Sequence, residues 1–149
     1  MKKEYGRSMI EMLGVLAIIG VLSIGGLAGY TMAMNRHRAN TALDYAQKAF
    51  IVVQTMGDGT QAVAEADCSA DYILGETAPA SSLSACKVTR TVATTAGAQA
   101  TTTVTITATT DAVADAIASR IGDTSSSSSL KFTLTDNGTA GQTWARSAN

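Results

Sequence analysis

Glu11 is the residue whose surroundings most clearly call for a chemical partner. It stands directly before an apolar segment, residues 12–34, that contains no charged side chain. A carboxylate at the edge of such a segment costs on the order of a few kcal/mol in lipid unless it is neutralised or paired. We therefore expect Glu11 to meet a cationic group.

The other residues that could do chemistry form no catalytic pattern. The single histidine, His37, lies between Arg36 and Arg38, where contact with solvent or with phosphate headgroups is expected rather than catalysis. Asp111 and Asp115 are four apart on an expected helix, as surface and capping carboxylates often are. No cluster of histidine, cysteine and carboxylate residues has metal-ligand spacing, and no glycine-rich phosphate loop follows a strand. The sequence thus predicts no enzyme activity, no metal and no cofactor.

The apolar segment exceeds the ~20 residues that a helix needs to cross a bilayer, so it belongs in lipid or in an equally apolar setting. Two simpler interpretations are open. The first is a secretory signal peptide with its cleavage site at residues 31–33, although the apolar stretch of such a peptide has only ~7–15 residues. A plain membrane anchor would leave Glu11 unexplained, and basic residues on both sides do not fix its orientation.

A short basic leader ends at Gly6, and then Arg7, Ser8, two apolar residues and Glu11 lead into the apolar segment. This arrangement resembles the class III signal and first helix of type IV pilins and of type II secretion pseudopilins. The resemblance implies that a peptidase cuts after Gly6, that the new terminus at Arg7 is N-methylated, and that Glu11 meets the amino terminus of a neighbouring subunit. Were the leader retained, Glu11 would instead pair with Arg7, Lys2 or Lys3 of a neighbouring subunit. Arg7 stands where that family usually has phenylalanine or methionine, and the segment lacks its frequent mid-helix proline.

Beyond residue 34 the apolar pattern narrows to a single stripe. Apolar residues recur at spacings of four and three, which is typical of an amphipathic helix. We expect one helix from about Met9 to Thr55, ended by the glycines of 57–59. Its first half would pack among other copies, and its second half would carry a globular domain. The stripe consists of Ala39, Leu43, Ala46, Phe50 and Val53.

Cys68 and Cys86 are the only cysteines, and they bracket a loop that holds Gly75 and the one proline, Pro79. In a domain that the resemblance places outside the cytoplasm, these two thiols are expected to form a disulfide. Closing a loop of this size stabilises by ~3 kcal/mol in the chain-entropy model. Two buried free thiols are the alternative.

Four segments after Cys86 have the residue patterns of strands. Apolar residues alternate with threonine over 101–109 and with polar residues over 130–135, so each run has one apolar face. Segment 87–94 is rich in β-branched residues, and 142–146 returns the chain with the only tryptophan, Trp144.

The connecting segments carry helix and turn signals. Thr110 is expected to cap a helix that Gly122 ends, and alanine-rich 60–67 is expected to be helical. The serines of 125–129 predict a flexible loop or a place for modification. Hairpin turns are expected at 95–99 and 136–138, where the Asn137 motif also matches a glycosylation acceptor, although a turn explains it better.

These patterns predict an α+β fold in which a small antiparallel sheet packs on the carboxyl half of a long N-terminal helix. Charged residues make up only 15% of the chain and the formal net charge is −1, so no nucleic-acid partner is indicated. The expected parts are a leader over 1–6, a transmembrane or assembly helix over 7–34, its amphipathic continuation over 35–56 and a β-rich head over 57–149.

The resemblance implies a structural pilin subunit that polymerises with identical copies into an extracellular filament. Its expected partners are the cytoplasmic membrane before assembly, a prepilin peptidase and the pilus assembly machinery. It would reside in the bacterial inner membrane as a precursor and on the cell surface afterwards, in adhesion, motility or DNA uptake. The alternatives are a pseudopilin of type II secretion and a membrane-anchored envelope binding domain that never polymerises.

Overall fold

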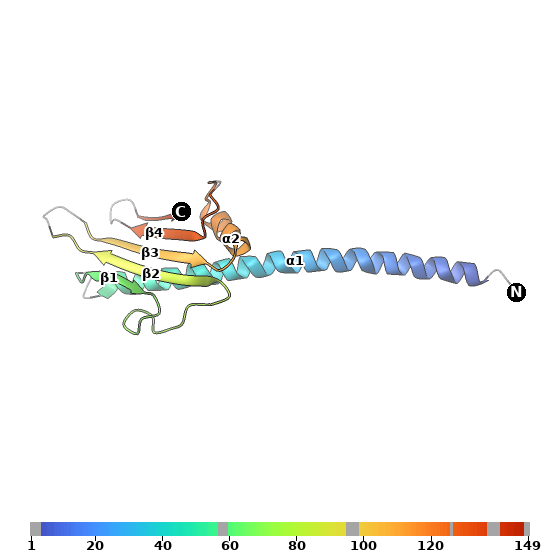
Figure 1. Cartoon of the computed structure of the whole chain (residues 1–149), viewed down its shortest axis with the longest axis horizontal. Helices are drawn as coiled ribbons and strands as arrows, with labels where there is room; N and C mark the ends of the chain where they lie inside the picture. The colour runs from blue at the N-terminus through green and yellow to red at the C-terminus, as the bar shows by residue number, and fades with distance from the viewer. Residues whose placement is uncertain (1–3, 57–59, 95–98, 126, 137–140, 148–149) are drawn as a thin grey trace. The chain divides into compact units, whose positions relative to one another are not determined.

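The chain divides into two compact units, Met1–Met34 and Asn35–Asn149. We call the second the head unit. The structure is a computed structural model, drawn in Figure 1, and the side chains of residues 4–8 are not described. The residues whose placement is described are 4–56, 60–94, 99–125, 127–136 and 141–147.

Helix α1 runs from Glu4 to Thr55 and is the longest element. It ends at the residue that the apolar pattern indicates, but it begins earlier than the expected start near Met9. Extending an existing helix adds one hydrogen bond per residue without a new nucleation cost, so the residues before Met9 can continue it. The glycines of 57–59, expected to end the helix, lie outside the described residues.

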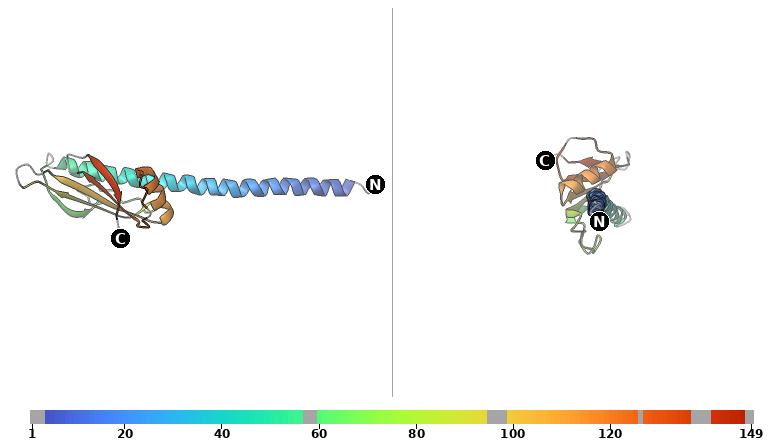
Figure 2. Two further views of the ribbon diagram at one scale, coloured as in Figure 1. Left: turned by 90° about the horizontal axis from the view of Figure 1, so that it is seen from above. Right: turned by 90° about the vertical axis from the view of Figure 1, so that its right-hand side faces the viewer.

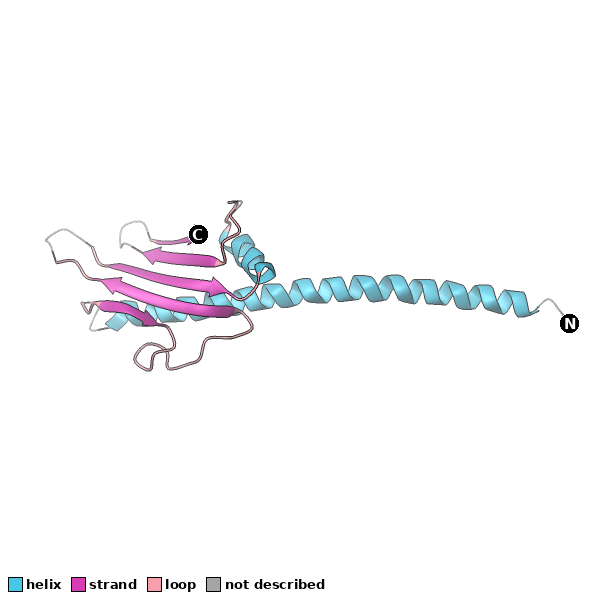
Figure 3. Cartoon of the chain, viewed as in Figure 1, coloured by secondary structure: helices cyan, strands magenta, loops and turns pink. Residues whose placement is uncertain are grey.

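The head unit contains a five-stranded antiparallel sheet in the order β1-β2-β3-β4-β5, so each strand pairs with its neighbours in the sequence. Helix α2, Asp111–Ile121, is inserted between β3 and β4. Figure 3 shows the strands and helices in contrasting colours. The fold is α+β, as the sequence predicts. The strands are β1 Val63–Asp67, β2 Leu83–Thr91, β3 Thr101–Ala108, β4 Lys131–Asp136 and β5 Gln142–Arg146.

The prediction of a helix over 60–67 is wrong, because Val63–Asp67 forms strand β1. Ala66 pairs with Val88, and Asp67 pairs with Lys87. Alanine is the best helix former, but intrinsic propensity amounts to less than about 1 kcal/mol per residue, and pairing with the long strand β2 outweighs it. An ion pair between the exposed side chains of Glu65 and Lys87 adds a contact between the two strands.

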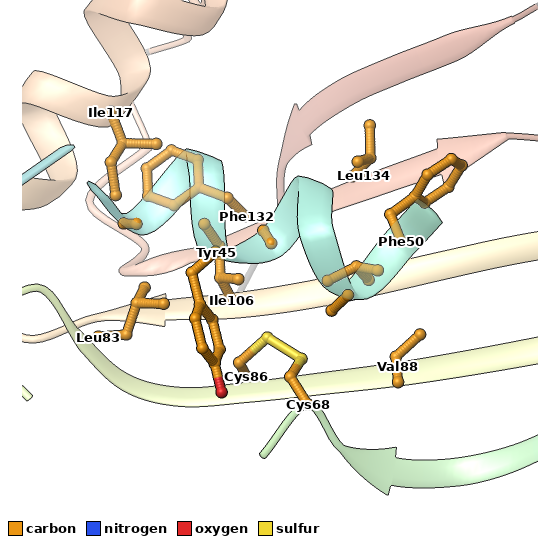
Figure 4. Packing of buried hydrophobic residues seen from close by; sticks show 14 of the residues in the cluster. Tyr45, Phe50, Cys68, Leu83, Cys86, Val88, Ile106, Ile117, Phe132 and Leu134 are labelled. Carbon is orange, nitrogen blue, oxygen red and sulfur yellow. A yellow bond between two sulfur atoms is a disulfide. The ribbon is translucent and has the colours of Figure 1, made fainter. Parts of the chain in front are cut away.

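The core lies between the inner face of the sheet and the part of α1 that belongs to the head unit. Figure 4 shows Phe50 and Tyr45 of α1 in this cluster with side chains from the strands and from α2. The predicted stripe is buried except for Leu43, which is only partly buried. The fully or nearly fully buried residues of α1 are Ala39, Ala42, Tyr45, Ala46, Ala49, Phe50 and Val53.

Strand β3 alternates as the sequence predicts, with every second side chain buried. Val104 lies between Val88 of β2 and Leu134 of β4, which extends the apolar face across the sheet. Thr103 and Thr105 lie on the opposite face. Since the pleat sends successive side chains to opposite faces, the alternation fixes which face covers the core.

Helix α2 has the expected caps. The Thr110 hydroxyl accepts a hydrogen bond from the Val113 amide at 3.4 Å, and Gly122 has a φ of 74° in the left-handed region that favours glycine. Figure 2 shows α2 from two further directions, and in both Figures 1 and 2 it lies beside the head-unit part of α1. The caps define the two ends of α2, and its buried side chains, Val113 and Ile117 among them, pack it against the core.

The serine run is more ordered than a uniform flexible loop in its described members. The Asp123 carboxylate accepts hydrogen bonds from the amide and hydroxyl of Ser125, both at 2.9 Å, and these lower the pKa of Asp123. Ser129 is buried, and its hydroxyl accepts from the Lys131 amide at 3.2 Å. Serine hydroxyls bond neighbouring backbone groups readily, which is why such a run can form turns. The expected turn residues 95–98 and 137–138 lie outside the described residues.

Candidate functional site

The first unit presents an uncovered apolar surface. Its large apolar side chains from Met9 to Met32 are between 53% and 75% exposed. The described chain has one helix, Met9–Thr55, that is long and apolar enough to cross a membrane, and its most apolar stretch has no buried residue. A side chain built on any of the helix glycines in this stretch would meet open space; these are Gly14, Gly20, Gly25, Gly26 and Gly29. Every side of the segment is therefore available to lipid or to another helix.

Gly6, Arg7 and Glu11 all lie in α1. Glu11 is exposed, one helical turn beyond Arg7, at the amino end of the apolar segment. The side chain of Arg7 lies outside the described residues, as does the leader before residue 4. The contact that the resemblance assigns to Glu11, with the amino terminus of a neighbouring subunit, stays a prediction.

Cys68 and Cys86 form a buried disulfide with a Cα–Cα distance of 5.5 Å. The Cys68 amide also donates to the Cys86 carbonyl at 3.0 Å, so backbone and side chains both tie the end of β1 to β2. The described residues contain no free cysteine.

The loop closed by the disulfide is held against α1. The Tyr45 hydroxyl donates to the Glu76 carbonyl at 2.7 Å, and Ile73 is buried in the core. Burial, followed by the negative charge of Glu76, raises the pKa of Tyr45. The phenol therefore stays a neutral donor across ordinary pH.

A buried arginine links the sheet to the end of α1. Arg90 of β2 donates from Nη1 to the carbonyl of Val53 at 3.0 Å and to that of Gln54 at 2.6 Å. The Gln54 side chain in turn donates to the Asp136 carboxylate at 2.8 Å. Because the last carbonyls of a helix lack partners within it, the guanidinium serves as a cap supplied by the sheet.

The structure also places the other residues that were considered for catalysis. His37 is exposed in α1, and Asp111 lies in the first turn of α2. Asp115 lies 3.7 Å from Nη2 of Arg146, whose side chain is 7% exposed and whose Nε donates to the Ser129 carbonyl at 2.6 Å. In the part of the chain that the structure describes, no group of three histidine, cysteine or carboxylate residues could hold a metal ion.

The sequence analysis missed a hollow of about 630 Å³ on the head unit. It lies among α1, the end of α2 and strand β5. The available signal was a second stripe on α1, because Asn40, Asp44 and Gln47 have the spacing of one helix face. Its lining residues are Asn40, Leu43, Asp44, Gln47, Arg120, Ile121 and Trp144.

The protein thus combines an N-terminal helix that is long and apolar enough to cross a membrane with an α+β unit that contains one disulfide. No protein-family model, no curated protein and no solved structure matches it significantly.

Proposed function

We propose that this chain is a structural subunit that polymerises through its N-terminal apolar helix into a type IV pilus-like extracellular filament. The observation that carries the proposal is the uncovered apolar surface of the first unit, in a helix that continues into a disulfide-bonded α+β head unit. Such a surface is unstable in water. Lipid before assembly and the helices of other copies afterwards would both cover it.

Glu11 would set the axial register between neighbouring helices of the assembly. Within a bundle of apolar helices an ionised carboxylate needs a cation, and the amino terminus left by cleavage after Gly6 would supply one. Arg7 would be that terminus. Glu11 of one copy would then meet Arg7 of the next, and only one axial offset between the two helices would satisfy both charges.

The glycines of the first unit support close packing of such helices. Between helices in lipid the hydrophobic effect provides little drive, so small residues that let backbones approach matter more. Gly25 and Gly29 are one turn apart on α1, and neither has a neighbour within 4 Å of a built side chain. That face is free to receive another backbone.

A pseudopilin of type II secretion would use the same helix in a shorter polymer, and an anchored envelope domain would use it only in lipid. The test is electron cryomicroscopy of fibres sheared from cells that produce the wild-type chain or Glu11→Gln. We expect wild-type fibres with a core of the apolar segments and Glu11 beside the amino end of a neighbour. Glu11→Gln should abolish the fibres and leave the protein in the membrane fraction.

Asp71→Asn is the matched control, because Asp71 is an exposed carboxylate in the head unit. It should leave the number of fibres unchanged. Mass spectrometry of the assembled subunit would test cleavage after Gly6 and methylation of Arg7. Wild-type cells that make no fibres, with the chain monomeric in the membrane, would contradict the proposal and favour the anchored domain.

A further inference from the structure

The hollow on the head unit gathers polar side chains that the fold does not use. Asn40, Asp44 and Gln47 come from one face of α1, and Arg120 comes from the last turn of α2. The hydrogen bonds and ion pairs found for the described residues involve none of these four side chains. The Asn40 Oδ1 is buried without a hydrogen-bond partner. Their functional groups are therefore uncommitted.

An aromatic residue completes the hollow. Trp144 lies on β5 opposite Leu134 and is only partly buried, so its indole is accessible from one side. Leu43 and Ile121 add further apolar surface. A ligand held here thus needs one apolar face and several hydrogen-bonding groups around it.

The charges of the lining restrict the ligand further. Asp44 would repel an anion and Arg120 would repel a cation, while the two together are neutral. A wholly apolar ligand would leave these groups desolvated and unpaired, which is costly. A neutral ligand rich in hydroxyl groups fits, since a hydroxyl both donates and accepts.

We propose that this hollow is a binding site for a neutral sugar, such as a hexose or an N-acetylhexosamine. The C–H face of the sugar ring would pack on Trp144, and its hydroxyls would bond the carboxylate of Asp44, the amides of Asn40 and Gln47 and the guanidinium of Arg120. The hollow's volume, about 630 Å³, lies within the range of ~300–1,000 Å³ typical of small-ligand sites. All residues of this site come from a single chain, so its assignment does not rest on the proposed polymerisation.

A second copy of the chain is the competing occupant. The cores of protein–protein interfaces are depleted in charged residues and enriched in apolar ones. This hollow instead places Asp44 and Arg120 together with two amides. The lining therefore favours a small polar ligand over a protein surface.

The chain provides its own reporter, because Trp144 is its only tryptophan. The full chain in detergent would be titrated with glucose, galactose, N-acetylglucosamine, N-acetylgalactosamine and lactose while Trp144 fluorescence is recorded. Concentrations up to about 50 mM suffice, since a few hydrogen bonds and one aromatic contact support dissociation constants near 1 mM. Glycerol at equal concentration controls for bulk effects. We expect saturable change with at least one sugar.

Asp44→Ala should weaken that binding by about tenfold, the effect of one hydrogen bond to a charged group. Lys48→Ala is the matched control, because Lys48 is exposed on the same helix and does not line the hollow. It should bind as the wild type does. Saturation-transfer NMR gives a readout independent of fluorescence, and it should show weaker sugar binding by Trp144→Phe than by the wild type, because the smaller ring offers less surface to the sugar.

Three results would overturn the proposal. The first is the absence of saturable change with every sugar of the panel. The second is a Trp144 fluorescence that changes with protein concentration and not with sugar, which would assign the hollow to contact between copies. The third is a wild-type affinity retained by Asp44→Ala, which would show that the sugar does not bind in this hollow.

Discussion

Arg90 Nη1 lies 2.6 Å from the carbonyl oxygen of Gln54, so a side chain of β2 caps the carboxyl end of α1. Helix α1 has no basic residue of its own in its last turn. The cation that would favour a helix carboxyl end therefore comes from the sheet, across the core. This contact fixes where the helix ends relative to strand β2.

Replacing Arg90 should destabilise the head unit. Arg90→Met removes the charged donor from two helix carbonyls, and we expect the free energy of unfolding to fall by about 2–3 kcal/mol. The measurement is urea unfolding of the full chain in detergent, followed by Trp144 fluorescence. Lys131→Met, at an exposed position of β4, is the control and should change stability by less than about 0.5 kcal/mol. Equal losses in the two variants would contradict the capping role.

Removing the disulfide should have an effect of similar size. The double variant Cys68→Ala and Cys86→Ala opens the loop in the unfolded chain, and we expect a loss of about 3 kcal/mol. Alanine avoids burying a hydroxyl, because both positions are in the core. Reductant should lower the unfolding midpoint of the wild type and leave the double variant unchanged. A wild-type midpoint insensitive to complete reduction would show that the bond adds nothing.

The cap of α2 can be tested at a single hydroxyl. Thr110→Ala removes the acceptor for the Val113 amide and should cost about 1 kcal/mol. Thr124→Ala changes an exposed threonine beyond the end of α2 and should be close to neutral. Thermal unfolding by circular dichroism would compare the two. If both variants melt with the wild type, the Thr110 hydroxyl does not stabilise the helix.

The raised pKa of Tyr45 predicts that the stability of the head unit depends on pH in the alkaline range. Burial and the charge of Glu76 raise the pKa of Tyr45 above its ordinary value of 10.0, so folding favours the neutral phenol. This contribution is complete below the pKa of the unfolded chain and is lost as pH rises through the folded-state pKa. The head unit should therefore lose stability above about pH 10.

Tyr45→Phe should remove that part of the alkaline dependence. It also removes the hydrogen bond to the Glu76 carbonyl, so its stability at neutral pH should be lower than that of the wild type by about 1 kcal/mol. Spectrophotometric titration of wild type minus variant isolates the Tyr45 phenol. A difference titration centred below pH 10 would contradict the prediction.

The features of this chain that depend on local pattern could be predicted from the sequence. The uncharged run after Glu11 indicates a long apolar helix, and the alternation around Val104 and Ile106 indicates a strand with its buried face. Thr110 and Gly122 mark the ends of α2 because capping involves only the nearest backbone groups. In each case the residues that determine the structure lie within a few positions of one another.

The tertiary structure decided what depends on residues far apart in the chain. Strand β1 forms because β2 offers it a partner, although its alanines suggest a helix. Arg90 is a cap only because the sheet brings it to Gln54, and the polar stripe that contains Asp44 lines a hollow only because Arg120 and Trp144 lie beside it. Sequence periodicity records which face of an element is apolar. Which elements meet, and which polar groups they bring together, follows from packing of the whole core.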